Sequence, residues 1–331
     1  MKIKQIPEDF IVDEALELKI SKSKEDYSII KLTKKGIETF RLTEMLSKIL
    51  GIKQKFIGFA GLKDKKAMTT QFISLYKVSK EKIESIKIKD VRIRFIGYTK
   101  NRINLGDLDG NNFKITLRDL ENKFRIPKNI QVENYFDEQR FGNKANTHLV
   151  GKALVKRDFR EACKILSLDA DKNCIQEIRK QPKRLLRFYV AAYQSYLWNK
   201  ILSEIMFKKK NVVRYEYPLG KIFFSKIRIK NFGIPLINFD LEKDKYVKDV
   251  MNKEGIKKED FIFRELPELV TESRERDAFV DVKNIKCRWS RDELNKGKLK
   301  LEVSFFMPKG AYATMVLKKL GALYLKQTKA F

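Results

Sequence analysis

Histidine and cysteine are almost absent from this sequence, whose 331 residues include one histidine, His148, and three cysteines. The cysteines, Cys163, Cys174 and Cys287, lie far apart and form no C-x-x-C pair, so the sequence predicts neither a zinc site nor a disulfide framework. Ser-His-Asp and Cys-His mechanisms are also disfavoured, because each needs an imidazole beside its nucleophile. Acid–base chemistry is therefore expected from carboxylate, lysine or tyrosine side chains, without a metal.

Long apolar runs are missing as well. No segment approaches the roughly 20 consecutive apolar residues that a membrane helix needs. The first residues, MKIKQIPEDF, carry acidic side chains and no apolar core with a small-residue cleavage site, which argues against a secretory signal. We therefore expect a cytoplasmic protein that does not enter a membrane.

Positive charge is abundant: 72 lysines and arginines stand against 43 acidic residues, which gives a formal net charge of +29. Such a field favours a polyanion, because lysine and arginine displace the counterions condensed on phosphates. A merely solvated basic surface is the alternative, since thermal adaptation or biased genome composition also enriches charged residues. The charge thus predicts an RNA or DNA partner but names no reaction.

The order of apolar patterns indicates how the chain is organised. Its length favours roughly two domains. Short strands and one helix, with an apolar stripe over Leu42–Leu50, are predicted in residues 1–149, and helices in residues 150–210. Residues 211–286 are irregular and punctuated by prolines, and a strand pattern returns at Leu299–Phe305. We predict that this tail completes the sheet of the first segment and that the middle is an insertion.

One short loop concentrates charge beside the predicted sheet. Phe56–Ala60 and Gln71–Tyr76 are predicted strands, and Gly61–Lys66 joins them with one carboxylate, Asp64, among three lysines. Nearby cations favour the ionised carboxylate and attract phosphate, so this loop could hold RNA and present a nucleophile. From the residues alone, an ordinary solvated turn is the favoured interpretation, because Lys-Asp-Lys runs are common in surface loops.

The same loop resembles a known motif. Ala60-Gly61-x-Lys63-Asp64-x-x-Ala67-x-Thr69-x-Gln71 is similar to the signature loop of TruD-type pseudouridine synthases, whose aspartate is the essential catalytic residue. Three further segments resemble motifs of that family in the same order: residues 4–14, 134–142 and 308–314. The resemblance covers the whole chain and is firmest in residues 1–149 and 299–320. Around residues 271–276 the match to the inserted domain's basic motif is poor.

The resemblance implies an α+β fold, a pseudouridine synthase catalytic core with a mixed, mainly antiparallel sheet and flanking helices. The catalytic domain would comprise residues 1–150 and 287–331, with residues 151–286 as an inserted TRUD domain. The implied reaction isomerises uridine to pseudouridine in tRNA, at uridine 13, although some relatives accept other sites, and it needs no cofactor. The sequence shows no sign of an obligatory protein partner. Asp64 would be the catalytic nucleophile.

The family's other site residues carry over onto matching positions. The implied substrate-binding residues are Lys4, Phe10, Asn134, Phe136 and Tyr312. The target base must leave its stack, and an aromatic face such as that of Phe136 can then grip it, while Asn134 can bind Asp64 or uracil. The RNA-backbone contacts we predict are Lys63, Lys65, Lys66 and Arg140, although a pair with a carboxylate inside the fold is at least as good an interpretation for Arg140. Two positions depart from the motifs: Asp137 replaces a glycine, and Tyr312 stands where phenylalanine is common.

Two other functions fit parts of the sequence. A non-catalytic RNA-binding protein on the same fold would need only the charge. A glycoside hydrolase would need a second carboxylate near Asp64, for which Glu8, Asp9 and Glu14 are available. The aromatic series Phe188–Trp198 has helical spacing and is interpreted as core, and His148 as incidental.

Overall fold

The computed structural model describes residues 1–142, 144–241, 244–270 and 274–325. Contacts divide the chain into two compact units: Met1–Ile130 with Val282–Ala311, and Gln131–Asp281 with Tyr312–Ala330. The predicted division into a catalytic and an inserted domain is a functional one and stays a prediction. No helix in the described part of the chain combines the length and apolar character needed to cross a membrane.

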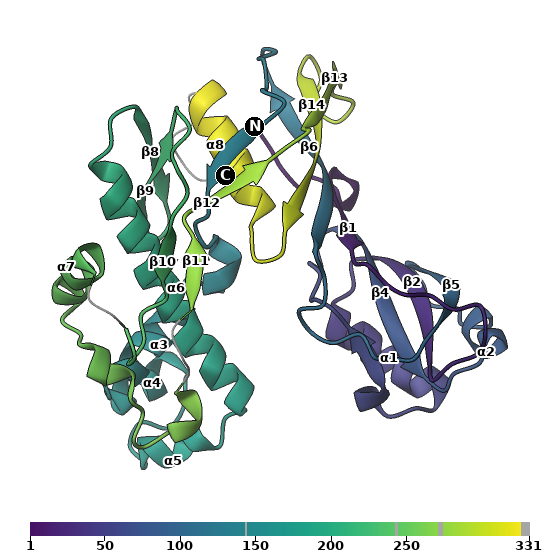
Figure 1. Cartoon of the computed structure of the whole chain (residues 1–331), viewed down its shortest axis with the longest axis horizontal. Helices are drawn as coiled ribbons and strands as arrows, with labels where there is room; N and C mark the ends of the chain where they lie inside the picture. Colours follow the sequence, from purple (N-terminus) through teal and green to yellow (C-terminus); the bar gives the residue numbers. More distant parts are fainter. Residues whose placement is uncertain (143, 242–243, 271–273, 326–331) are drawn as a thin grey trace. The chain divides into compact units, whose positions relative to one another are not determined.

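The first unit is built on an eight-stranded sheet (Figure 1). Its strand order is β13-β14-β6-β1-β4-β2-β5, with β3 paired to β4, and β1–β4 is its one parallel pair among the described residues. The mixed, mainly antiparallel sheet with flanking helices is therefore confirmed. The strands are β1 (Phe10–Ala15), β2 (Tyr27–Lys35), β3 (Ile57–Phe59), β4 (Met68–Tyr76), β5 (Val91–Thr99), β6 (Gly110–Leu120), β13 (Lys286–Arg291) and β14 (Leu299–Pro308); the helices are η1 (Pro7–Asp9), α1 (Thr39–Leu50), η2 (Gln54–Phe56) and α2 (Lys80–Glu84).

Helices cover one face of this sheet. Leu42, Leu46 and Leu50 of α1 pack with Ile30 and Leu32 of β2 in a core cluster that also takes in α2. The predicted stripe on α1 is thus largely confirmed, although Ile49 is 51% exposed because it lies off the Leu42-Leu46-Leu50 row. The predicted strand over Gln71–Tyr76 begins earlier, at Met68, within the Asp64 motif.

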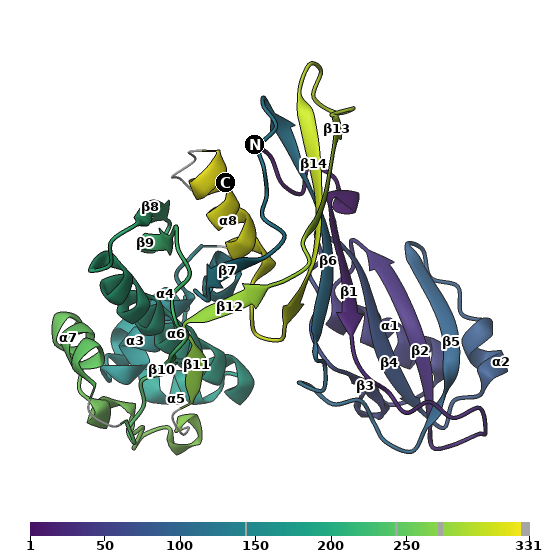
Figure 2. The same cartoon turned by 45° about the horizontal axis from the view of Figure 1, so that its top comes forward.

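The second unit is helical around small strand pairs. Figure 2 shows the 25-residue α6 running past the β8–β9 hairpin, and α6 also contacts α3, β10 and α7. The helices predicted for residues 150–210 are confirmed. Residues 211–286 were expected to be irregular but contain a hairpin and the helix α7. The hairpin forms because β-branched and aromatic residues are frequent in both of its strands. Its elements are β7 (Ile130–Glu133), η3 (Glu138–Phe141), α3 (Thr147–Val155), α4 (Phe159–Ile165), α5 (Cys174–Arg179), α6 (Lys183–Phe207), β8 (Val212–Tyr217), β9 (Gly220–Ser225), β10 (Gly233–Pro235), α7 (Lys245–Glu254), η4 (Lys258–Phe261), η5 (Pro267–Leu269), β11 (Glu275–Asp277), β12 (Phe279–Val282) and α8 (Ala313–Tyr324).

Candidate active site

The Asp64 loop joins the antiparallel strands β3 and β4 of the first unit. Its ends are fixed by two buried alanines, Ala60 and Ala67, which are 1% and 0% exposed. Between them Asp64 is half-buried, while Lys65 and Lys66 are exposed. The loop therefore presents a carboxylate and two lysines between two buried ends, at the position that the sequence predicted.

Lys4 is the ion-pair partner of Asp64. Its Nζ lies 2.5 Å from Asp64 Oδ2 and 4.1 Å from the centroid of the Phe10 ring, so the ammonium joins the carboxylate to an aromatic face. Topology explains this meeting: β1 starts at Phe10 and runs parallel to β4, with Ile11 opposite Met68. The structure thus brings together three of the predicted site residues.

Lys34 supports the loop from within the core. It continues the row of Ile30 and Leu32 on the helix-covered face of β2, and it is 1% exposed. Its Nζ donates to the carbonyl oxygens of Ile37 at 2.6 Å, Asp64 at 3.2 Å and Lys63 at 3.4 Å. Burial lowers the pKa of Lys34 to about 8, although the nearby Asp64 carboxylate opposes the shift.

Lys63 differs from its predicted role as a phosphate contact. Its side chain is 5% exposed, and its Nζ forms an ion pair with Glu14, which is completely buried, at 3.1 Å. Its backbone N–H donates to Thr39 Oγ1 at 3.1 Å. Burial raises the pKa of Glu14, and the Lys63 ammonium opposes this. Lys63 therefore anchors the loop, and its ammonium is paired inside the fold.

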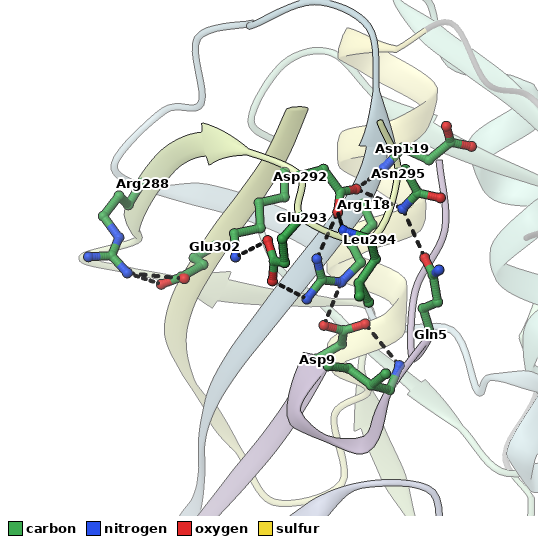
Figure 3. A network of polar contacts seen from close by, with 12 residues as sticks. Gln5, Asp9, Arg118, Asp119, Arg288, Asp292, Glu293, Leu294, Asn295 and Glu302 are labelled. Carbon is green, nitrogen blue, oxygen red and sulfur yellow. Dashed lines mark hydrogen bonds and ion pairs between the residues drawn. The ribbon is translucent and has the colours of Figure 1, made fainter. Parts of the chain in front are cut away.

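Arg118 fixes the chain segment that carries Lys4 and Phe10 (Figure 3). Its guanidinium donates to Asp9 at 2.8 Å, Asp292 at 2.8 Å and Glu293 at 3.1 Å. Its backbone N–H and carbonyl also pair with those of Lys2, both at 2.9 Å. Since Asp9 precedes Phe10 directly, this buried network ties the amino-terminal segment to β6 and to the β13–β14 turn.

The remaining predicted substrate residues gather in the second unit. Asn134, directly after β7, is 8% exposed, and both ends of its amide are engaged. Its Oδ1 accepts a hydrogen bond from Arg276 Nη2 at 2.6 Å, and its Nδ2 donates to the carbonyl oxygen of Asp277 at 3.0 Å. The amide is thereby held in one orientation, with one further N–H and one lone pair available.

Phe136 lies at the centre of an aromatic cluster in this unit. Its ring centroid is 5.6 Å from that of Trp198 and 6.2 Å from that of Tyr312, both in edge-to-face geometry. Its backbone is clamped by Asn199 of α6, which donates to its carbonyl and accepts from its N–H, both at 2.8 Å. The predicted neighbours Phe136 and Tyr312 are thus in contact, on a backbone held by a side chain from another element.

The contacts of Asp137 show how an aspartate is accommodated where the family motif has glycine. It is 4% exposed, it accepts hydrogen bonds from Thr314 and Lys318 of α8, and it caps η3 by accepting from the Glu138 N–H at 2.8 Å. Its charge is therefore paired inside the unit and is not added to the surface.

Sequence reasoning missed Asn199 and Arg276, and it described Arg140 and Phe188 incompletely. Phe188 is 37% exposed and lies 5.3 Å from the Arg140 guanidinium, so it is not core, whereas Tyr193 and Trp198 are fully buried as predicted. Polar side chains on the buried face of α6 were the available signal for Asn199. Arg276 adjoins residues 271–273, where the motif match was poor and which lie outside the described residues.

Comparisons with known proteins agree on one family. The family model described as tRNA pseudouridine synthase D (TruD) matches residues 1–181 and 227–320. A "Probable tRNA pseudouridine synthase D 2" of Methanocaldococcus jannaschii is 32% identical, with 96% of this chain and 91% of that protein covered. The tRNA pseudouridine synthase D of Aquifex aeolicus is 28% identical, with 97% and 98% covered.

A solved structure gives the same result. The crystal structure of the tRNA pseudouridine synthase D (TruD) from Methanosarcina mazei superposes with a TM-score of 0.70 at 28% sequence identity, covering 96% of this chain and 92% of that one. The resemblance carried by the four sequence motifs is confirmed: the chain belongs to the tRNA pseudouridine synthase D (TruD) family and is an enzyme of the isomerase class.

Proposed function

We propose that this protein converts uridine 13 of tRNA to pseudouridine, with the Asp64 carboxylate as nucleophile. The observation that carries the proposal is the trio of Asp64, Lys4 and Phe10, in which a half-buried carboxylate meets a cation that lies over an aromatic ring. A nucleophile must be a carboxylate anion, and the Lys4 ammonium is placed to pair with that anion. tRNA as substrate also favours a cytoplasmic location.

The reaction exchanges one bond to the sugar for another. The bond from C1′ to N1 breaks, the uracil turns, and C1′ bonds to C5; the hydrogen lost from C5 is balanced by the one gained at N1. No atom enters or leaves overall, so no cofactor is needed in this proposal. Asp64 would attack the nucleotide to release N1, and the detached base must be kept from escaping meanwhile.

The second-unit cluster supplies groups for holding that base. Asn134 retains one N–H and one acceptor, a pair that suits the imide edge of uracil. The Phe136 ring, which is 8% exposed and already contacts Arg276, would stack on the base, a contact worth about 1–3 kcal/mol. Tyr312 walls the same cluster. Lys65 and Lys66, both exposed, would contact RNA phosphates, whereas Lys63 keeps its structural place beside Glu14.

The rival hydrolase mechanism has little support. Each carboxylate that could partner Asp64 is taken by a separate cation: Glu8 by Lys35, Asp9 by Arg118 and Glu14 by Lys63. A retaining or inverting hydrolase needs its second carboxyl group free to act on the sugar or on water.

The test is to incubate a full set of unmodified tRNA transcripts with the protein and to map pseudouridine. We expect product at uridine 13, and none in a matched transcript with cytidine at that position. Product at another uridine would reject the site assignment. Binding without product in every transcript would favour the non-catalytic RNA-binding alternative, and free uracil would favour the hydrolase.

A further inference from the structure

Two arginines of the second unit contact the same aromatic ring, that of Phe136. The Cζ of Arg276, on β11, lies 4.1 Å from the Phe136 ring centroid and 5.4 Å from that of Trp198. The Cζ of Arg140, on η3, lies 5.8 Å from the Phe136 centroid and 5.3 Å from that of Phe188. Both guanidinium groups are therefore held against rings, not extended into solvent.

Several N–H groups of these two arginines make no hydrogen bond to the described residues. Arg276 uses Nε and Nη2 on the backbone and side-chain oxygens of Asn134, at 2.6–3.0 Å. Arg140 uses Nε on Ser195 Oγ at 3.0 Å. Each guanidinium has five N–H donors, so Nη1 of Arg276 and both terminal nitrogens of Arg140 remain without an acceptor among the described residues.

Neither guanidinium has a direct ion-pair partner among the described residues. Among residues 1–142, 144–241, 244–270 and 274–325, no carboxylate lies within ion-pair distance of Arg140 or Arg276. Burial lowers the pKa of Arg276 to about 10; the neighbouring Arg140 charge adds to that shift, whereas Tyr312 and Asp277 oppose it. Burial also lowers the pKa of Arg140. Two cations that repel each other in a partly desolvated place cost free energy, which a bound anion would offset.

We infer that Arg140 and Arg276 together form a binding site for one phosphodiester group of the RNA, an inference that rests on the proposed function. The planar guanidinium fork matches two phosphate oxygens, and stacking on Phe136 limits its motion before RNA arrives. Since Arg276 also binds Asn134 Oδ1, the phosphate site and the amide proposed to read uracil share one side chain.

The first experiment measures tRNA affinity against salt concentration for Arg140→Met, Arg276→Met and the double variant. If both arginines hold one phosphate, the double variant lowers the slope of log K against log [salt] by about 0.7–0.9, and neither single variant by more. Arg214→Met is the matched control, because Arg214 is an exposed arginine of this unit paired with Glu216. An unchanged slope, or a loss twice as large, overturns the inference.

The second experiment neutralises the phosphate instead. Transcripts carry one methylphosphonate at a defined linkage near the target uridine, and binding is measured. At one such linkage the methylphosphonate should weaken binding of the wild-type protein roughly ten-fold. Arg276→Met already lacks this contact, so it should bind the modified and the unmodified transcript equally well. If the effect of the methylphosphonate and the effect of Arg276→Met were independent, so that their fold-losses multiplied at every linkage, the inference would be overturned.

Both readouts are binding measurements, so they are separate from the test of catalysis. A protein that forms no pseudouridine would defeat the proposed function and leave the anion site testable. Arg276→Lys keeps the charge and loses the fork; it should keep the salt slope but bind tRNA more weakly. Arg276→Lys also replaces Arg276→Met if thermal unfolding shows that Arg276→Met does not fold.

Discussion

The buried Lys34 ammonium donates a hydrogen bond to the backbone carbonyl of Asp64, 3.2 Å away, beneath the loop that presents the Asp64 carboxylate. Its three N–H donors meet three carbonyl oxygens, those of Ile37, Lys63 and Asp64. A neutral amine has one donor fewer and no charge. We therefore expect the position of the loop to depend on the protonation state of Lys34.

Turnover should consequently fall as Lys34 loses its proton near its pKa of about 8. We expect single-turnover rates to decline between about pH 7.5 and 9 in the wild-type protein. Lys34→Met should be slower by roughly ten-fold or more and lack this decline, and Lys34→Arg should move it to higher pH. A decline that is identical in Lys34→Met would show that another group causes it.

The free energy of unfolding, in contrast to the turnover rate, should rise with pH over that range. The folded pKa of Lys34 is lowered from 10.5 to about 8, so between these values the unfolded chain binds more protons than the folded one. This group therefore adds stability as pH rises through the window, by up to about 3 kcal/mol. Denaturation by urea at pH 7.5 and 9.5, compared between wild type and Lys34→Met, separates this term from loss of activity.

Asn199 should matter for activity because it holds the backbone of Phe136 through two hydrogen bonds. Asn199→Asp keeps the acceptor for the Phe136 N–H and removes the donor to its carbonyl, so we expect kcat/KM to fall by about ten-fold. Gln194→Glu is the matched control, since Gln194 donates from the same helix to Ile237. Equal losses in both variants would mean that general packing of α6, not the Phe136 clamp, is responsible.

The Asp64 loop could be predicted from the sequence because its determinants are local: two apolar strands enclose a charged segment. The surroundings of that loop could not. An exposed lysine and a buried one look alike in sequence, and Lys63 is distinguished only by Glu14, which lies on β1 and is brought near by the parallel β1–β4 pairing.

The sequence also could not predict the contacts around Phe136 in the second unit, because they join residues that lie far apart in the chain. Ser195 and Asn199 lie one helical turn apart on the buried face of α6, where polar side chains need partners, and those partners are Arg140 and Phe136. The apolar period of α6 predicts a core helix and does not indicate which backbone it will hold. Arg276 comes from a three-residue strand, too short to give a periodic signal.

Arg118 should be among the residues most important for stability in the first unit. Arg118→Met would leave Asp9 and Asp292, which are 1% and 6% exposed, without their cation, and we expect a loss of about 3–5 kcal/mol. Arg288→Met is the control: its pair with Glu302 is solvent-exposed on the arginine side, so the loss should stay below about 1 kcal/mol. Chemical denaturation measures both, and similar losses would contradict this ranking.

His148 should titrate far below the usual range of histidine. Burial lowers its pKa from 6.5 to about 4, and its ring stacks on Tyr196 with centroids 4.6 Å apart. Because the folded pKa is depressed, the stability this group contributes is present above about pH 6.5 and is lost as pH falls toward 4. As the only histidine, its NMR signal is unambiguous. A midpoint near 6.5 would show that the ring is solvated.

The most direct test of the account compares pseudouridine formation by wild type, Asp64→Asn and Asp90→Asn on one tRNA transcript under single-turnover conditions. Asp90 is an exposed carboxylate of the same unit, in a left-handed backbone conformation that asparagine also adopts. We predict that Asp64→Asn binds the transcript within about three-fold of wild type and forms no detectable product, while Asp90→Asn retains full activity. Measurable pseudouridine from Asp64→Asn would contradict the assignment of Asp64 as the nucleophile.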